Sequence, residues 1–326
     1  MLPRTESLGR ILCLLGMCFA FAGIGMGHLS QYYVYLDVFS HLTLHFGIAA
    51  IACGWAYLMP KHRLFFAVAM MLGGMVVIGL WPSFQPRVLP PRAVVEVPEG
   101  YRELRVMSFN VWLWNREQEA IRQEIELQDP DIIFFAEVNR YTRDMAASMV
   151  DTYPHQYPTM VQYGVHLRIM SRIPLSNVTV RGPWKGPVFA QASLGPQWGN
   201  LTVLGTHTIR APQVNAQWMQ VNTLADYVRT LPSPRLVVGD FNATPYSRMV
   251  RTFASRTGLR RRSTMPTWPS NNLRLPQLAI DHMFADATLM FPDGVQVGEA
   301  AGSDHLPIMA RILVPVPGRA AALQQE

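Results

Sequence analysis

Asp304 and His305 are the two adjacent residues of this chain best suited to chemistry. A carboxylate beside an imidazole can orient the ring, and the pair suits activation of water next to a metal-bound phosphate. Asp240 and Asn242 lie upstream, where another apolar run ends. Both pairs can act on one substrate only if the fold brings their segments together.

Polar side chains follow five short apolar runs rich in Val, Ile and Phe. Such runs are typical of strands buried on both faces. Ligands of layered α/β folds collect where these strands end and loops begin. The five runs end on Asn110, on Glu137, on His207, on Asp240 with Asn242, and on Asp304 with His305. One such end could arise by chance, but five indicate a single site.

The residue types favour one chemistry. Carboxylate and amide oxygens suit Mg²⁺ or Mn²⁺, and the scarcity of thiols argues against a zinc or iron centre. A neutral imidazole can take a proton from water, while a protonated one can stabilise charge on phosphoryl oxygens. The pattern therefore predicts hydrolysis of a phosphate ester.

From about residue 104 to residue 314, the chain resembles the endonuclease/exonuclease/phosphatase superfamily, the deoxyribonuclease I-like fold. The matching segments, in order, are Ser108-Phe109-Asn110, Glu137, residues 170–174, Gly205-Thr206-His207, residues 239–242, Ile280-Asp281-His282 and Ser303-Asp304-His305. Each segment is weak evidence alone, and their order and spacing carry the resemblance. It implies a four-layer α/β sandwich, in which two mixed β-sheets lie face to face with helices outside.

The resemblance also implies a metal site for Mg²⁺ or Mn²⁺. Glu137 would be the main metal ligand, assisted by Asn110 and Asp304. These side chains supply the hard oxygen ligands that such cations prefer.

The resemblance implies catalytic roles for five further residues. Asp240 would position or deprotonate the attacking water, and Asn242 would donate to a phosphoryl oxygen. His207 would stabilise the pentacovalent transition state. His305, oriented by Asp281, would bind the phosphate or act as acid or base. The expected reaction is in-line attack of activated water on phosphorus.

Several of these residues also have structural interpretations. Asp240 and Asn242, taken alone, are common turn formers and helix caps. His282 should point away from its neighbour in a strand, so we assign it to packing or to support of the site. His166 fits a core position. Trp268 fits core packing better than stacking on a substrate.

The substrate stays open at this level. Residues 165–170 depart from the usual small or aliphatic pattern in a segment that borders the substrate cleft of relatives. The catalytic region is also too compact for the long loops that grip duplex DNA. We weigh a phosphodiesterase or phosphatase acting on a lipid headgroup or small phosphoester, an extracytoplasmic nuclease, and a non-catalytic binding module. The complete acid and imidazole set argues against the last.

The first part of the chain has a different composition. Residues 11–36, 38–60 and 64–85 contain no Asp, Glu, Lys or Arg. Each stretch reaches the roughly 20 residues that cross a bilayer as a helix. We predict three transmembrane helices, at about 11–30, 39–59 and 64–84, and hence contact with a lipid bilayer. A cleaved signal peptide fits less well because the first run is long and two more follow.

Positive charge predicts the orientation of these helices. Arg4 and Arg10 precede the first helix, and Lys61 and Arg63 separate the second from the third. The segment between the first two helices, residues 29–38, has no Lys or Arg. The N-terminus should therefore be cytoplasmic, and three crossings would place the catalytic domain on the extracytoplasmic side of the inner (plasma) membrane.

These observations divide the chain into four parts. We expect a membrane anchor at residues 1–85, a proline-rich tether at 86–100, a catalytic domain at 101–316 and a flexible tail at 317–326. All three cysteines fall in the anchor, so the catalytic domain has no disulfide. The net charge of +6 could favour anionic lipid surfaces or nucleic acid, but much of it lies in scattered arginines and not in a run. No protein partner is evident.

Three histidines in the anchor, His28, His41 and His45, fit two roles. Paired intramembrane histidines can ligate haem or metal, but they more often hydrogen-bond between helices. We favour the second role.

Overall fold

The computed structural model describes most of the chain. The described residues are 3–59, 61–92, 96–158, 167–182, 186–263, 265–271 and 273–317. His166 lies outside them, as do residues 93–95 of the expected tether and residues 318–326 of the expected tail.

Within the described residues, the strands form two six-stranded sheets. In spatial order, the first contains β11 (Gln296–Val297), β12 (Ile308–Pro315), β1 (Tyr101–Asn110), β2 (Ile132–Ala136), β4 (Arg168–Ser171) and β3 (His155–Pro158). The second contains β5 (Leu175–Arg181), β6 (Val188–Leu194), β7 (Thr202–His207), β8 (Arg235–Asp240), β10 (Asp281–Ala285) and β9 (Arg260–Arg261). β1 is parallel to β2, β7 is parallel to β8, and the other neighbours are antiparallel. Both sheets are therefore mixed.

The two sheets face each other across an apolar core because side chains alternate along each strand. Leu104 and Val106 of β1 belong to this core, whereas Met107 and Phe109 belong to the cluster on the opposite face of the sheet. Gly205 of β7 lets the sheets approach closely, since a Cβ there would lie 2.1 Å from the ring of Phe134 in β2. This contact lies two residues before the predicted site residue at the end of β7.

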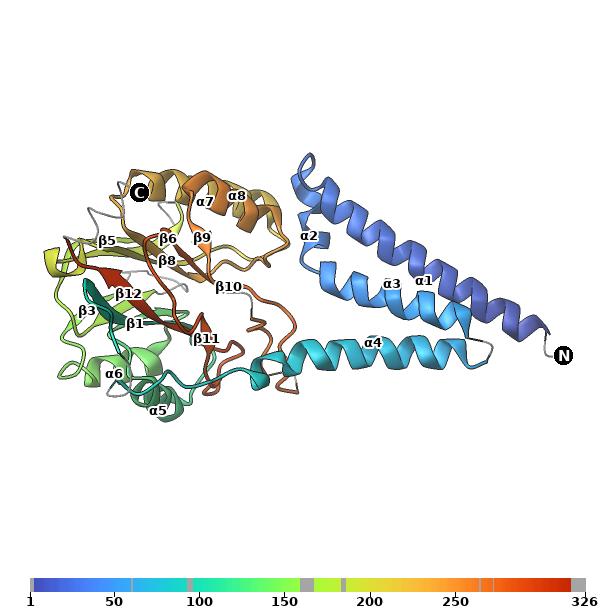
Figure 1. Ribbon diagram of the computed structural model, residues 1–326, viewed down its shortest axis with the longest axis horizontal. Helices are drawn as coiled ribbons and strands as arrows, with labels where there is room; N and C mark the ends of the chain where they lie inside the picture. The colour runs from blue at the N-terminus through green and yellow to red at the C-terminus, as the bar shows by residue number, and fades with distance from the viewer. Residues whose placement is uncertain are drawn as a thin grey trace.

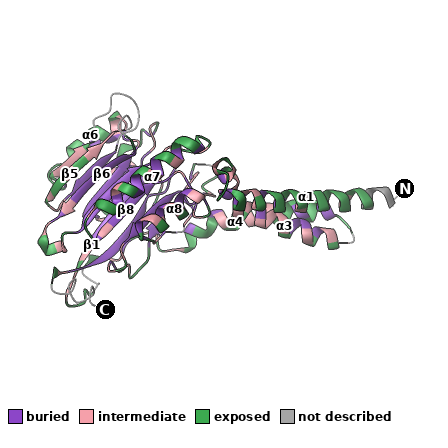
Figure 2. Ribbon diagram, turned by 90° about the horizontal axis from the view of Figure 1, so that it is seen from above, coloured by how far each residue is buried: buried purple, intermediate pink, exposed green. Residues whose placement is uncertain are grey.

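Helices cover the outer face of each sheet, as Figure 1 shows. Their bounds are α5 (Gln118–Gln128), α6 (Arg140–Ser148), α7 (Val214–Thr230) and α8 (Arg248–Thr257), and a short 3₁₀ helix, η5 (Pro196–Trp198), follows β6. Ile121 of α5 and Met145 of α6 pack on the first sheet, and Val221 of α7 and Phe253 of α8 pack on the second. Figure 2 shows the strands buried between these helices, whose outer faces are exposed. The layers are those of an α/β sandwich, which confirms the predicted sandwich of two mixed sheets flanked by helices.

The N-terminal helices project from this sandwich as a separate rod (Figure 1). They are α1 (Pro3–Leu29), η1 (Val34–Leu36), α2 (Asp37–Ser40), α3 (Thr43–Leu58), α4 (Arg63–Leu80) and η2 (Trp81–Phe84). Among the described residues, two stretches, Ser7–Leu29 and Arg63–Phe84, are long and apolar enough to cross a membrane. Residues 34–40 and 43–58 reach that length only together, and the two parts meet at 57°. The segment predicted as a membrane helix at about residues 39–59 is therefore bent at residues 41 and 42, and it counts as a span only if its two parts are taken together.

Polar contacts fix the helical rod to the sandwich. Asp37 accepts hydrogen bonds from the backbone N–H groups of Arg248 (2.6 Å) and Met249 (3.4 Å) at the start of α8. A carboxylate stabilises the N-terminus of a helix because the first N–H groups have no partner within the helix. The Arg248 guanidinium also donates to the carbonyl of Ser30, at 2.9 Å. The bend between α1 and α3 is thus docked on the catalytic domain.

The segment that follows η2 also lies against the sandwich. The Arg87 guanidinium donates to the carbonyl of Gly298, at 2.7 Å. The backbone N–H of Leu89 donates to Gln128 Oε1 at the end of α5, at 3.0 Å. Arg92 pairs with Asp131, at 2.8 Å. These bonds hold the segment after η2 against the first-sheet side of the sandwich.

Candidate active site

Strand register brings the predicted site residues to one edge of the sandwich. In the first sheet, Asn110 lies beside Ala136, so Glu137 begins the neighbouring loop. In the second sheet, Asp240 lies beside His207 on one side and opposite Asp281 on the other. These strand ends meet where ligands of layered α/β folds collect.

Asn110 joins the two sheets. Its side-chain Nδ2 donates to Glu137 Oε1 at 3.1 Å and to Asp240 Oδ2 at 3.0 Å. Its Oδ1 accepts a hydrogen bond from the backbone N–H of Trp112, at 3.0 Å. The amide is buried, so these bonds set the spacing of the two carboxylates.

Glu137 is held in a costly backbone conformation. Its φ of 57° lies in the left-handed region, where a residue other than glycine costs about 1 to 3 kcal/mol. Its Oε2 accepts from the backbone N–H of Leu113 at 3.1 Å, and His207 Nε2 lies 3.7 Å from Oε1. Burial alone would raise the pKa of Glu137, but the His207 imidazole and the hydrogen bonds from Asn110 and Leu113 outweigh it, so the pKa is lowered. Glu137 is therefore a charged, fixed carboxylate.

Asp240 lies at the centre of the site and is buried. Its Oδ1 accepts from the backbone N–H of Asn242 at 2.7 Å. His207 Nε2 is 3.5 Å and His305 Nε2 is 3.8 Å from its Oδ2. Burial and the nearby Asp281 raise the pKa of Asp240 to about 6, against the opposing effect of the two imidazoles. The carboxylate is thus a better proton acceptor than an ordinary aspartate.

Asp281 and His305 form a buried pair. His305 Nδ1 lies 2.9 Å from Asp281 Oδ2, which also accepts from the hydroxyl of Thr267 at 2.6 Å. Burial would lower the pKa of His305, but Asp281, Asp240 and Asp304 raise it to about 10. Burial would raise the pKa of Asp281, but its contact with His305 lowers it. Asp281 therefore orients the ring and favours its charged form, with Nε2 turned toward the centre.

Two buried atoms of the site have no hydrogen-bond partner among the described residues. They are Asp304 Oδ1 and His207 Nδ1. Asp304 Oδ2 accepts from the indole N–H of Trp268 at 3.0 Å, and His305 Nε2 lies 4.0 Å from Oδ1. Burial raises the pKa of Asp304, and the charge of Glu137 adds to this effect. A buried polar atom without a partner is costly and points to a ligand.

Asn242 begins the loop that follows β8. Its φ of 47° is a left-handed conformation that Asn tolerates. Its Nδ2 donates to the carbonyl of Thr208 at 2.9 Å and lies 3.3 Å from Asp240 Oδ2. Asn242 thus forms a turn and also belongs to the site, so the two interpretations of this residue coexist.

Three residues of the site were missed or assigned otherwise from the sequence. Trp268, which we assigned to core packing, is half-buried and donates to a predicted metal ligand. Thr267 supports Asp281, and the Ser303 hydroxyl donates to the carbonyl of Asn110 at 2.7 Å. Ser303 belongs to the matched segment Ser303-Asp304-His305, whereas Thr267 and Trp268 lie outside the matched segments, so no motif marked their contacts. His282 packs as expected, with Nε2 2.8 Å from the carbonyl of Ala243.

The side chains fit a divalent cation. Glu137 and Asp304 supply charged oxygens, and the unpartnered Asp304 Oδ1 is an available ligand atom. Asp240, Asp281 and His305 also lie close enough together to hold an ion. We favour Glu137 and Asp304 as the metal ligands. The other group is less suitable, because His305 Nδ1 is already hydrogen-bonded to Asp281. Hard oxygen ligands suit Mg²⁺ or Mn²⁺.

Comparison with known proteins agrees with this geometry. The model of the Endonuclease/Exonuclease/phosphatase family matches residues 107–305. The chain belongs to this family. The match contains all eight predicted site residues, from Asn110 to His305.

Solved structures of similar fold support the assignment. The human Nocturnin catalytic domain with bound sulfate has 18% identity and a TM-score of 0.53, over 69% of this chain and 99% of that one. A Staphylococcus aureus beta toxin variant with bound magnesium ions has 17% identity and a TM-score of 0.50, over 64% and 99%. The 3′ phosphatase NExo from Neisseria, bound to a product DNA hairpin, has 17% identity and a TM-score of 0.53, over 64% and 98%. No protein of curated function matches the sequence. At these identities the likeness concerns the fold of the family alone.

Proposed function

We propose that this family member is a membrane-anchored phosphoesterase that uses Mg²⁺ or Mn²⁺ and activated water. The observation that carries the proposal is the buried carboxylate of Asp240 between the imidazoles of His207 and His305, beside two further carboxylates. Such a set can accept a proton from water and stabilise a phosphoryl group at the same time. A protein that only binds its ligand would not need this set of carboxylates and imidazoles.

The proposed roles follow from the contacts. Asp240 orients the attacking water and takes its proton. His305, held by Asp281, presents a charged Nε2 to the phosphoryl oxygens, and His207 acts on them from the side of Glu137. Asn242 donates to one of these oxygens once substrate displaces its present contacts. These donors are already in position for the negative charge that develops on the phosphoryl oxygens in the transition state.

Glu137 and Asp304 would hold the cation, with Asn110 beside them. The bound cation would supply charge stabilisation at the phosphoryl oxygens. Trp268 supports this role by fixing one oxygen of Asp304 and leaving the other for a ligand. The bound magnesium of the similar toxin structure supports the choice of cation.

Glu137→Gln is expected to weaken cation binding by roughly tenfold to a hundredfold, because one charged ligand becomes a neutral amide. Titration calorimetry with Mn²⁺ measures this effect without reference to activity, and circular dichroism should show an unchanged fold. The matched control is Glu119→Gln on α5, where the side chain is 69% exposed and should not affect binding. Equal Mn²⁺ affinity of Glu137→Gln and wild type would contradict the assigned ligand.

The substrate class we favour is a phosphoester at the membrane, either a lipid headgroup or a small molecule. The docked helices support this choice, because the contacts at Asp37 and Arg87 hold the catalytic domain against the anchor. An extracytoplasmic endonuclease or exonuclease is the alternative, supported by the similar phosphatase bound to DNA.

A substrate panel tests these alternatives. The purified chain is assayed with Mg²⁺ against sphingomyelin, phosphatidylinositol phosphates, plasmid DNA, RNA and an aryl phosphodiester. We expect the lipid or the small ester to be hydrolysed fastest. Preference for plasmid DNA or RNA would favour the nuclease instead.

We further propose that α1, residues 34–58 and α4 form three membrane spans, with the catalytic domain on the extracytoplasmic side. Arg4 and Arg10 mark one cytoplasmic segment, and Lys61 and Arg63 mark the other. A reporter active only outside the cytoplasm should be active when fused after Val314 and silent when fused at Lys61. The reverse pattern would place the enzyme in the cytoplasm and favour soluble substrates.

A further inference from the structure

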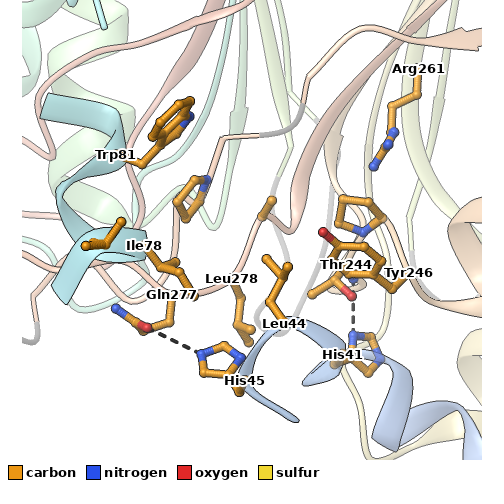
Figure 3. A pocket seen from close by; sticks show the side chains of 14 residues that line it. His41, Leu44, His45, Ile78, Trp81, Thr244, Tyr246, Arg261, Gln277 and Leu278 are labelled. Atoms are coloured by element: carbon orange, nitrogen blue, oxygen red, sulfur yellow. Dashed lines mark hydrogen bonds between the residues drawn. The ribbon is translucent and has the colours of Figure 1, made fainter. Parts of the chain in front are cut away.

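A cavity of about 300 Å³ lies where the N-terminal helices meet the catalytic domain (Figure 3). The helices contribute Leu44 of α3, Val77 and Ile78 of α4, and Trp81 of η2. The catalytic domain contributes residues 244–246, 277–279 and Arg261. The volume reaches the lower end of the range for small-molecule sites, about 300 to 1,000 Å³. None of the eight predicted active-site residues lines this cavity, so it is a separate site.

The cavity has an apolar side and a cationic side. The side chains from α3, α4 and η2 are apolar or aromatic, and Figure 3 shows Arg261 across the cavity from Ile78 and Trp81. Leu44, Val77 and Trp81 are 45%, 61% and 50% exposed, so the apolar side opens outward along the helices. A ligand with an acyl chain could therefore enter from the direction that would face lipid.

Arg261 has an unused donor. Its Nη1 is buried and has no hydrogen-bond partner among the described residues. Its neighbours differ, since Arg260 is exposed and the Arg262 guanidinium donates to the carbonyl of Leu289 at 3.2 Å. Burial lowers the pKa of Arg261, and the main opposing effect comes from Tyr246, not from a carboxylate. A buried guanidinium in this state has room for an anionic oxygen, which it binds strongly.

His45 supplies a second unused polar atom. Its Nε2 lies 3.3 Å from Gln277 Oε1, while its buried Nδ1 has no partner in the described part of the chain. His41 Nδ1 accepts from the backbone N–H of Thr244 at 3.1 Å, as the dashed line in Figure 3 shows. Our expectation that these histidines bond between helices is wrong, because both bond to loops of the catalytic domain. His28 is exposed on α1.

We propose that this cavity binds one anionic phospholipid, with its phosphate on Arg261 and an acyl chain along Leu44, Val77 and Ile78. The inference rests on the proposed membrane anchoring, and it does not require that the lipid be the substrate. The unpartnered Arg261 Nη1 and His45 Nδ1 match the polar headgroup, and the apolar side matches an acyl chain.

The bound lipid would also support the catalytic loops. Thr244 lies two residues after Asn242, and Ala279 lies two residues before Asp281. The lipid would therefore bridge the helices and the two loops that adjoin these active-site residues. A lipid bound in the cavity would strengthen the contact between the N-terminal helices and the catalytic domain.

Native mass spectrometry of the full chain in detergent, titrated with phosphatidylglycerol or phosphatidylcholine, tests the proposal. We expect one phosphatidylglycerol per chain, bound more tightly than phosphatidylcholine. Arg261→Ala should weaken phosphatidylglycerol binding roughly tenfold to a hundredfold, the loss expected for one hydrogen bond to a charged group. The matched control Arg260→Ala removes the same charge from an exposed neighbour and should bind as wild type does.

A second pair of variants tests the apolar side without removing charge. Ile78→Trp fills the cavity and should block binding, whereas Val76→Trp, at a site that is 41% exposed and outside the cavity, should not. Equal affinity for both lipids, or equal binding by Arg261→Ala and Arg260→Ala, would overturn the proposal. Hydrolysis of a soluble aryl phosphodiester is measured on the same samples. Lipid binding without hydrolysis would overturn the proposed enzyme alone, and hydrolysis without selective binding would overturn the lipid site alone.

Discussion

His305→Ala lowers the rate of phosphoester hydrolysis by about 10² to 10⁴, the range expected for a positioned acid or base. The reason is the geometry of the buried pair, in which Asp281 fixes Nδ1 and Nε2 faces Asp240 and Asp304. Alanine removes the imidazole whose Nε2 lies 3.8 Å from Asp240 and 4.0 Å from Asp304. Steady-state kinetics with an aryl phosphodiester measure the loss, with circular dichroism to confirm the fold.

His207→Ala is expected to fall in the same range, and the double variant should lose less than the product of the two single losses. Both rings contact Asp240 and serve one transition state, so their effects are not independent. His155→Ala, in the edge strand β3, is the control and should keep full activity. If both single variants also kept it, the roles given to the imidazoles would be wrong.

Asp240→Asn is expected to cause the second large loss, again about 10² to 10⁴ in rate. Asparagine keeps the shape of the side chain and one acceptor oxygen, but it cannot take a proton from water. The backbone N–H of Asn242 can still donate to that oxygen, so the loop should keep its position. The rate constant should therefore fall with little change in KM, since substrate binding does not need this proton transfer.

Two further measurements separate a loss of proton transfer from a loss of cation binding or of folding. The cation affinity of Asp240→Asn should stay near that of wild type, because Asp240 is not among the proposed ligands. Its thermal unfolding should remain cooperative, which shows that the buried network tolerates the amide. Activity equal to wild type would mean that another group activates the water.

Part of the sandwich was predictable because several of its longer elements have a clear periodic signal. The spacing of apolar residues predicts helices at residues 117–128 and 212–230, and the structure has helices at Gln118–Gln128 and Val214–Thr230. The apolar run at residues 307–314 predicts a closing strand, and β12 runs from Ile308 to Pro315. The ends differ by one or two residues because the hydrophobic period does not define caps.

The site could be predicted because strand ends in a layered fold converge. The eight residues lie in one network, in which Asn110 joins Glu137 to Asp240 and His305 joins Asp281 to Asp304. The local sequence could not reveal Trp268 as a donor to Asp304, because the two residues are 36 positions apart. Contacts of that range depend on how loops pack, and no periodic pattern encodes them.

The anchor shows that composition alone does not predict where a helix is interrupted. Residues 39–59 contain no Asp, Glu, Lys or Arg, yet the helix breaks at His41 and Leu42 and resumes at Thr43. The cause is docking, since Asp37 caps α8 and His41 accepts a hydrogen bond from Thr244 of the catalytic domain. Such tertiary contacts override helix propensity.

The metal dependence of hydrolysis by the wild-type chain tests the proposed phosphoesterase activity. An aryl phosphodiester is incubated with the purified chain and Mg²⁺, then with excess chelator, and then with Mg²⁺ restored. We predict that product release stops with chelator and returns when the cation is restored. Asp240→Asn should show the same metal dependence at a rate about 10² to 10⁴ lower. Release that persists in excess chelator, or an intact ester in the presence of Mg²⁺ and Mn²⁺, would contradict the account.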